Sequence, residues 1–488
     1  MSKSTLYYYS PILIVLTIYA VLLYFNMNHC YFWDNIQQTS KEAHWFYENN
    51  FSSILLPDFS SQSAITGTGY HPPLTGIITA LLWKIFGVKL WVSHVFIFAV
   101  ALILIYNTIR LSERLFSDIT APWFTLLIMM DPTIMTQVAI ASPDIILLTA
   151  TVVSIRAVVW NKPFLLGISL VFLGLVNGRG MFACGIIFMF YISYTTKQLK
   201  DLLSFRYLLK KTVPFIPAFV VLLSYFSYYF ANRAWFFSAE NNFPWSSGWQ
   251  SPDTLYGVFK NIISYLMRIL ENGRIIVYFT LGIVLIQIFF FKKKKLDLTR
   301  FEISAALAFL SFFVLYLYFA ATTKNVISSR YYMPMNFFGF LIVFSMIRRI
   351  ASSNRFIPIS IFTGIFLLTG NLWVYPEKRT NFWDCTLAHI PFYELRVDCF
   401  NYLDKNAIGL EKVASGFCLY DNQRYIDLKP RNRFVNKSEG PQTEYYLYSN
   451  ISNLSDDFID ELNDPEKWKL EKEFRKDFVF IKILKRIK

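Results

Sequence analysis

Five charged residues stand out in this 488-residue sequence, because each lies beside or between apolar runs. Two are carboxylates, Asp34 and Asp144, and three are cations, Arg179, Lys324 and Arg330. A carboxylate can take a proton from an acceptor group while nearby cations stabilise a phosphate that leaves. Brought together by a fold, these residue types suit the transfer of a group away from an anionic lipid.

Each of these residues also has an ordinary structural interpretation. Asp34 and Asp144 each precede a predicted helix and could cap it, since Asp is a favoured N-cap residue. Arg179, within Gly-Arg-Gly, could anchor the chain by reaching toward lipid head groups. Lys324 and Arg330, taken singly, could be plain loop charges. The predicted convergence of all five on one side of a membrane favours a functional site.

The composition predicts a polytopic membrane protein. Of all residues, 55% are hydrophobic, 19% are aromatic and only 16% are charged, and the mean hydropathy is +0.38. Such a chain is too apolar for one soluble core. The net charge of +14 would suggest nucleic acid in a soluble protein, but here Lys and Arg cluster in short loops, as membrane orientation and anionic head groups require. We therefore expect membrane lipids and no nucleic acid as partners.

The apolar runs predict an all-α membrane domain over residues 1–374. Run length and loop charge indicate about 11 to 13 transmembrane segments, including a re-entrant pair over residues 124–141 that is broken at Asp131-Pro132. Lys3 favours a cytoplasmic N-terminus, and strongly basic loops such as residues 292–295 then fall on the inner side. Counting the helices alternately outward and inward from this N-terminus then places the first outer loop, residues 29–73, on the outer face, together with the five charged residues named above.

From residue 375 the sequence becomes polar and charged, which predicts a small extracytoplasmic α/β domain over residues 375–488. The periodicity predicts helices at residues 392–404 and 456–462, strands at residues 412–419 and 444–448, and a hairpin pairing residues 470–474 with 478–484. Cys385, Cys399 and Cys418 would lie in an oxidising compartment, where one disulfide among them is an open alternative.

Histidines gather around the first outer loop. His29, His44 and His71 lie in or beside it, and with Asp34 they could bind a divalent cation. None of them forms a short ligand pair of the kind that metal sites use, and the more common case is a hydrogen-bonded histidine at the membrane interface. We therefore predict no metal site and no certain cofactor, and leave a divalent cation as an open alternative.

Several short motifs resemble the pattern of C-type (GT-C) membrane glycosyltransferases. They are Trp33-Asp34 after the first helix, His71-Pro72-Pro73-Leu74 and Leu82-Trp83-Lys84-Ile85-Phe86-Gly87 at the two ends of the second, Ser142-Pro143-Asp144, and Arg330-Tyr331-Tyr332-Met333-Pro334. In this order they are similar to the protein O-mannosyltransferase and aminoarabinose transferase superfamily. The resemblance covers the membrane part, residues 9–373. The C-terminal α/β domain, residues 375–488, here called the tail, is similar only in size and placement.

The resemblance implies an inverting transferase in the cell inner membrane that takes a sugar from a polyprenyl-phosphate carrier on the outer face. By position, Asp34 would be the general base and Asp144 a supporting acid. The carrier phosphate would be bound by a group of candidates that share one side of the membrane: Arg179, Lys324, Arg330 and Tyr331. His71 would support the site. The family often has an acid directly after the first aspartate, whereas this chain has Asn35, which argues against a pair of carboxylates there.

Two other classes of protein share these gross features. A lipid-linked glycan flippase or transporter would also be apolar and basic on its inner side, although transporters tend to place ionisable groups at mid-bilayer and to contain internal repeats. The sequence shows no clear repeat, and most of its acids lie at one face. A membrane scaffold that presents the tail is the third alternative. The sugar and the acceptor, which could be lipid, glycan or protein, are not specified by these motifs.

Overall fold

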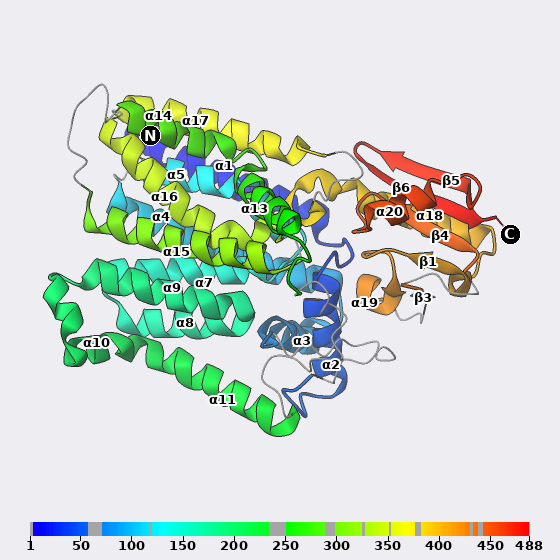
Figure 1. The fold of residues 1–488 in the computed structure, drawn as a ribbon, viewed down its shortest axis with the longest axis horizontal. Coiled ribbons are helices and arrows are strands. Elements are labelled where there is room, and N and C mark those ends of the chain that lie inside the picture. Colours follow the sequence, from blue (N-terminus) through cyan, green and yellow to red (C-terminus); the bar gives the residue numbers. More distant parts are fainter. Residues whose placement is uncertain are drawn as a thin grey trace.

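A bundle of long helices and a small α/β domain at one end of it make up the molecule (Figure 1). The structure is a computed structural model that describes residues 3–56, 71–116, 120–233, 250–287, 298–324, 327–350, 353–375, 382–429, 433–437 and 443–487. The N-terminus lies at the far end of the bundle from the α/β domain (Figure 1). Helix α1 (Lys3–Asn26) therefore delivers the segment after it, including Asp34, toward that domain.

The first half of the bundle runs from α1 to α9 (Gly178–Thr195). Between them lie α3 (Leu74–Phe86), α4 (Leu90–Leu115), α5 (Ala121–Met129), α6 (Pro132–Ala139), α7 (Asp144–Val159) and α8 (Pro163–Val176). Every residue of α5 and α6 is buried, and α7 is buried along most of its length. These helices form the centre of the bundle, and the break predicted at Asp131-Pro132 is confirmed.

The second half of the bundle packs around that centre. Its helices are α10 (Phe205–Thr212), α11 (Ile216–Arg233), α13 (Leu255–Leu270), α14 (Ile275–Ile286), α15 (Arg300–Thr322), α16 (Met333–Ile350) and α17 (Ser353–Thr369). Helices α13 and α14 meet at a bend of 84°. Asn272 and Gly273 make this bend with φ angles of 54° and 78°, a left-handed conformation that glycine adopts without strain.

The predicted number of membrane spans is not confirmed. Among the described residues, five helices are long and apolar enough to cross a membrane, or six if the bent pair is one span. Helices α3 and α8 have only 13 and 14 residues. At about 1.5 Å per residue such helices are shorter than the roughly 30 Å hydrocarbon core. The count of about 11 to 13 transmembrane segments therefore stays a prediction.

The α/β domain is built on a sheet with the order β1-β4-β6-β5. Its strands are β1 (Val413–Ser415), β4 (Tyr445–Ser449), β5 (Trp468–Lys476) and β6 (Val479–Arg486), and only β1 and β4 are parallel. Alternate residues of β6 face opposite ways, as a pleated strand requires. One face packs on α18 (Pro391–Lys405) and the other on α20 (Asp456–Leu462).

The tail agrees with the sequence prediction in its main elements. Helices α18 and α20, strand β4 and the closing hairpin lie where they were predicted. The predicted strand 412–419 is wrong in extent, because the parallel pairing ends at Ser415 and the chain then turns toward a small second pair, β2 (Asp421–Asn422) with β3 (Phe434–Val435). The five cysteines are all free thiols, so the disulfide left open by the sequence is not formed.

The segment after Asp34 joins the bundle to the tail. The helix predicted directly after Asp34 is divided into a π-helical turn, Ile36–Lys41, and α2 (Glu42–Glu48). Ser40 Oγ donates to Tyr425 O at 2.6 Å, the Tyr31 N–H donates to Ile426 O at 3.0 Å, and Lys41 pairs with Asp421. The tail therefore packs directly on the segment around Asp34.

Candidate active site

Arg330 lies at the centre of a cluster of three carboxylates. It belongs to a 3-10 turn, Ser329–Tyr332, that leads into α16. Its guanidinium pairs with Asp34, its Nη1 lies 3.0 Å from Asp384 Oδ2, and its Nε lies 3.7 Å from Asp144 Oδ2. Sequence segments about 300 residues apart are therefore held around one cation.

A second cation completes the cluster. Arg179 Nη2 lies 2.5 Å from Asp144 Oδ1. The ring of Tyr331 lies against both guanidiniums, with its centroid 3.9 Å from Arg179 Cζ and 5.2 Å from Arg330 Cζ. Cations over a tyrosine face are attracted by its ring electrons. Tyr331 thus contacts both arginines of the cluster.

The backbone before each carboxylate takes the left-handed conformation. Trp33 immediately before Asp34 has φ 54°, Ala141 three residues before Asp144 has φ 56°, and Phe382 two residues before Asp384 has φ 47°. Non-glycine residues adopt this region rarely and at some energetic cost, and they are enriched at functional sites. Each reversal turns the chain so that the acid lies at the start of a helical element, facing Arg330.

The N-terminus of α9 carries Arg179 to the cluster. Asn177 Oδ1 caps the helix by accepting from the Gly180 N–H at 3.1 Å, and His71 Nδ1 accepts from the Gly178 N–H at 3.0 Å. His71 therefore supports the site through the backbone. A Cβ at Gly180 would lie 1.7 Å from Leu173 O, so only glycine lets α9 start this close to α8.

The capping interpretations of the two predicted acids are not what the structure contains. The N-cap of α7 is Pro143, and the N-cap of the π-helical turn is Asn35. The carboxylates of Asp34 and Asp144 are instead paired with Arg330 and Arg179. Both acids therefore belong to one cluster of charges around Arg330.

Lys324 lies outside the cluster. Its Nζ is 2.8 Å from Asp253 Oδ2, and the Asp253 side chain is 79% exposed. His29 and His44 also point elsewhere: His29 stacks on Tyr393 with ring centroids 4.0 Å apart, and His44 packs against Trp83. Within the described residues, no group of three or more His, Cys, Asp or Glu side chains is arranged to hold a metal ion.

Asp384 is the site residue that the sequence analysis missed. It lies in the first turn of the tail, Trp383–Cys385, far from the membrane motifs. One signal was available, because the tripeptide Phe-Trp-Asp occurs both at residues 32–34 and at residues 382–384. In both copies a left-handed residue precedes the aspartate, and both aspartates contact Arg330.

Burial separates the roles of the three carboxylates. The side chains of Asp144 and Asp384 are 2% and 0% exposed, whereas that of Asp34 is 29% exposed. Burial raises the pKa of Asp384 above its ordinary value, although Arg330 opposes this shift. Burial opposes the charge of Arg330, but Asp384 and Asp34 outweigh it and raise the pKa of Arg330 well above its usual value. Asp34 is thus the most exposed of the three carboxylates.

Some polar atoms around Arg330 make no hydrogen bond with the described residues. They are Arg330 Nε, Asp144 Oδ2 and Asp384 Oδ2. They are held by ion pairs instead, since Asp384 Oδ2 lies 3.0 Å from Arg330 Nη1 and Arg330 Nε lies 3.7 Å from Asp144 Oδ2.

The fold has counterparts among solved structures. The chain is similar to the crystal structure of ArnT from Cupriavidus metallidurans bound to undecaprenyl phosphate, with a TM-score of 0.57 and 9% identity over 97% of each chain. It is also similar to the apo structure of the same protein, with a TM-score of 0.56 and 10% identity over 99% of this chain and 98% of that one. No family model and no curated protein matches the chain. The GT-C fold expected from the sequence is thus confirmed.

Proposed function

We propose that the protein is a glycosyltransferase that moves a sugar from a polyprenyl-phosphate carrier to an acceptor on the outer face of the inner membrane. The observation that carries this proposal is the accessible Asp34 carboxylate beside Arg330, with a second arginine at the edge of the cluster. The similar fold of ArnT bound to undecaprenyl phosphate supports a lipid-linked donor. The outer location of the cluster and of the tail, and the domain boundary near residue 375, belong to the same proposal.

In the proposed reaction, Asp34 accepts the proton of the acceptor hydroxyl as its oxygen attacks C1 of the sugar. The new oxygen–C1 bond forms while the bond from C1 to the carrier phosphate breaks, and the phosphate leaves with the bonding electrons. A single displacement of this kind inverts the configuration at C1. Asp34 suits the role of base because it is the most exposed of the three acids, and general-base assistance contributes roughly 10²- to 10⁴-fold to rates.

We assign the carrier phosphate to Arg179, whose guanidinium is held by the Tyr331 ring with its centroid 3.9 Å from Arg179 Cζ. Arg179 keeps 20% of its side chain exposed and lies at the N-terminus of a helix of 18 residues, where the helix dipole favours an anion. Arg330, by contrast, has a side chain only 5% exposed and is surrounded by carboxylates. Its role in the proposal is to hold Asp34 and to balance the three acids, while Lys324 contributes nothing directly.

The test is release of free polyprenyl phosphate. Purified protein in lipid should release it from a polyprenyl-phosphate sugar when acceptor-containing envelope extract is present. Single cysteines at the exposed positions Ser52 and Asn453 should react with an impermeant thiol reagent in spheroplasts, whereas one at Lys200 should not. No release with any sugar donor tried, or labelling with the opposite sidedness, would contradict the proposal.

One observation favours a lipid-glycan transporter as a second candidate. Asp131 and Arg274 form a buried ion pair at the break between α5 and α6 and beside the bend between α13 and α14. Broken helices with ionisable groups are typical of transporter sites. A transporter would move the lipid-linked sugar across the membrane of a vesicle without releasing polyprenyl phosphate. The same release assay therefore distinguishes a transporter from a glycosyltransferase.

A further inference from the structure

One face of the buried helix α6 holds the turn that carries Asp384. Gln137 Nε2 donates to Asp384 O, and Thr133 Oγ1 donates to Cys385 O at 3.3 Å. Thr133 and Gln137 are four residues apart and therefore lie on the same side of the helix. Two consecutive carbonyls of the turn are thus bound by a helix that contributes no carboxylate to the cluster.

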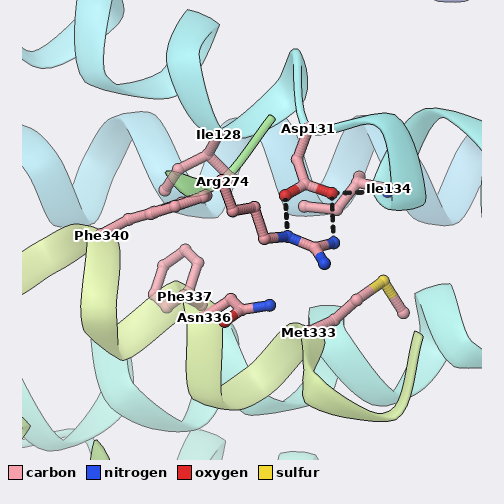
Figure 2. A pocket seen from close by; sticks show the side chains of 8 residues that line it. All are labelled: Ile128, Asp131, Ile134, Arg274, Met333, Asn336, Phe337 and Phe340. Carbon is pink, nitrogen blue, oxygen red and sulfur yellow. Dashed lines mark hydrogen bonds and ion pairs between the residues drawn. The ribbon is translucent and has the colours of Figure 1, made fainter. Parts of the chain in front are cut away.

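An ion pair fixes the N-terminus of α6. Arg274 Nε lies 2.7 Å from Asp131 Oδ2 and Arg274 Nη2 lies 2.8 Å from Asp131 Oδ1, as the dashed lines in Figure 2 show. Asp131 Oδ1 in turn accepts from the Thr133 N–H at 2.9 Å. Arg274 Nη2 also donates to Thr133 Oγ1 at 2.6 Å. Because the hydroxyl oxygen accepts from Arg274, its hydrogen is directed to Cys385 O.

The C-terminal end of α6 holds the segment of the proposed base. Asn35 Nδ2 donates to Ile140 O at 2.7 Å, and Asn35 directly follows Asp34. The chain then turns at Ala141 and begins α7 with Asp144. Helix α6 is therefore bonded or directly connected to the segments of all three carboxylates around Arg330.

We propose that α6 is the positioning element of the carboxylate cluster, and that Thr133 and Gln137 are the positioning residues that set Asp384 against Arg330. This inference rests on the proposed transferase function, because it assigns these side chains a part in organising the same site. Neither residue contacts the reacting groups in this scheme. Their contribution is to keep Asp384, and through Arg330 also Asp34, in one geometry.

The burial of Gln137 favours a positioning role for its hydrogen bond to Asp384 O. Its side chain is fully buried, and its Oε1 makes no hydrogen bond within the described part of the chain. A buried polar group without a partner lowers stability, so packing alone would favour an apolar side chain of the same shape. Among the described residues, the hydrogen bond that the Gln137 side chain makes is the one to the Asp384 carbonyl.

This predicts that activity and stability respond differently at residue 137. Gln137→Met keeps the shape and removes both the bond to Asp384 O and the unpaired Oε1, so the thermal midpoint should change little. Misplacement of a catalytic group by a fraction of an ångström to one ångström lowers rates by roughly 10- to 100-fold. We expect kcat to fall by about that factor, with KM for the lipid-linked donor nearly unchanged because Arg179 is untouched.

Substitutions at Thr133 test the second hydrogen bond to the Asp384 turn, and Thr136 in the same helix is the control position. Thr133→Val should lower kcat, while Thr133→Ser keeps the hydroxyl and should restore most of it. Thr136 is equally buried, but among the described residues its hydroxyl donates to Pro132 O in the same helix and not to the Asp384 turn. Thr136→Val should therefore leave kcat unchanged. A kcat loss that Thr136→Val shares, or that Thr133→Ser does not relieve, would overturn the proposal.

A readout that needs no transferase activity separates this inference from the proposed function. The Cys385 thiol is buried beside Ser328 Oγ at 3.1 Å, so its alkylation reports on loosening of the Asp384 turn. Peptide-level mass spectrometry should show faster labelling of Cys385 in Gln137→Met than in wild type or Thr136→Val. Labelling of Cys385 at the wild-type rate in Gln137→Met would overturn the proposed positioning role of α6. If wild type shows no transfer activity but the variant is labelled faster, only the transferase function is refuted.

Discussion

At the residue scale, the assignment of Asp34 as base makes a direct prediction. Asp34→Asn keeps the shape of the side chain but cannot accept a proton, so turnover should fall by roughly 10²- to 10⁴-fold. Arg330 would still face Asp144 and Asp384, so the protein should remain folded. Steady-state transfer assays with a thermal melt check both points.

The matched control for this prediction is another aspartate paired with a cation. Asp253→Asn breaks an exposed pair with Lys324 outside the cluster and should leave turnover unchanged. Near-normal transfer by Asp34→Asn would remove Asp34 from the reaction and leave Asp144 or Asp384 as the base to be tested next.

The sequence indicated the members of the cluster that belong to a local motif. Asp34, Asp144, Arg179 and Arg330 were selected because each adjoins an apolar run, and Tyr331 followed from the family motif around Arg330. The structure brings these five residues together. Asp384 could not be placed in the same way, because its contact with Arg330 depends on how the tail packs. Lys324 was included because of its charge and its predicted side of the membrane. Neither property determines which way its side chain points, and it pairs with Asp253 outside the cluster.

At the scale of elements, Gly180 determines where α9 begins. A Cβ there would lie 1.7 Å from Leu173 O and 2.8 Å from Leu173 C, which are backbone atoms that cannot move aside cheaply. Gly180→Ala should therefore push α9 away from α8, lower stability by about 1–3 kcal/mol and displace Arg179 from Asp144. Thermal unfolding together with transfer assays would measure both effects.

The same helix offers the opposite substitution as a control. A Cβ at Gly185 meets no atom within 4 Å, so Gly185→Ala should stabilise the protein by up to about 1 kcal/mol through helix propensity. If Gly180→Ala were as well tolerated as Gly185→Ala, the close start of α9 would have no part in placing Arg179.

Elements were predictable where the hydrophobic pattern alone decides them. The buried helices around Asp131-Pro132 and the closing hairpin followed from apolar runs and turn residues. Helix α13 was not predicted, because its 16 amphipathic residues do not form an apolar run long enough to cross a membrane alone, and because its end is set by a bend that packs against α17. The π-helical turn after Asp34 was also missed, since it depends on contacts with the tail.

At the scale of the whole molecule, the bundle and the tail are joined by buried aromatic contacts that include histidines. Phe32 stacks on His389 at 4.6 Å between ring centroids, and His29 stacks on Tyr393 at 4.0 Å. Burial lowers the pKa of His29 and of His389 to about 4. Both imidazoles are therefore neutral in the folded protein at neutral pH, and protonating them opposes this packing.

The linkage between these pKa values and folding predicts acid sensitivity. For His389 the folded pKa, about 4, is lower than the ordinary value of 6.5, so its stabilisation is complete above pH 6.5 and is lost as the pH falls from 6.5 toward 4. Its side chain is fully buried, and a shift of this size corresponds to up to about 3 kcal/mol. His389→Gln has no group that titrates in this range, so the free energy of unfolding should fall less steeply with acidification in this variant than in wild type. Unfolding in detergent at several pH values between 7.5 and 4.5 would measure the two slopes, and equal slopes would show that His389 does not link the tail's packing to pH.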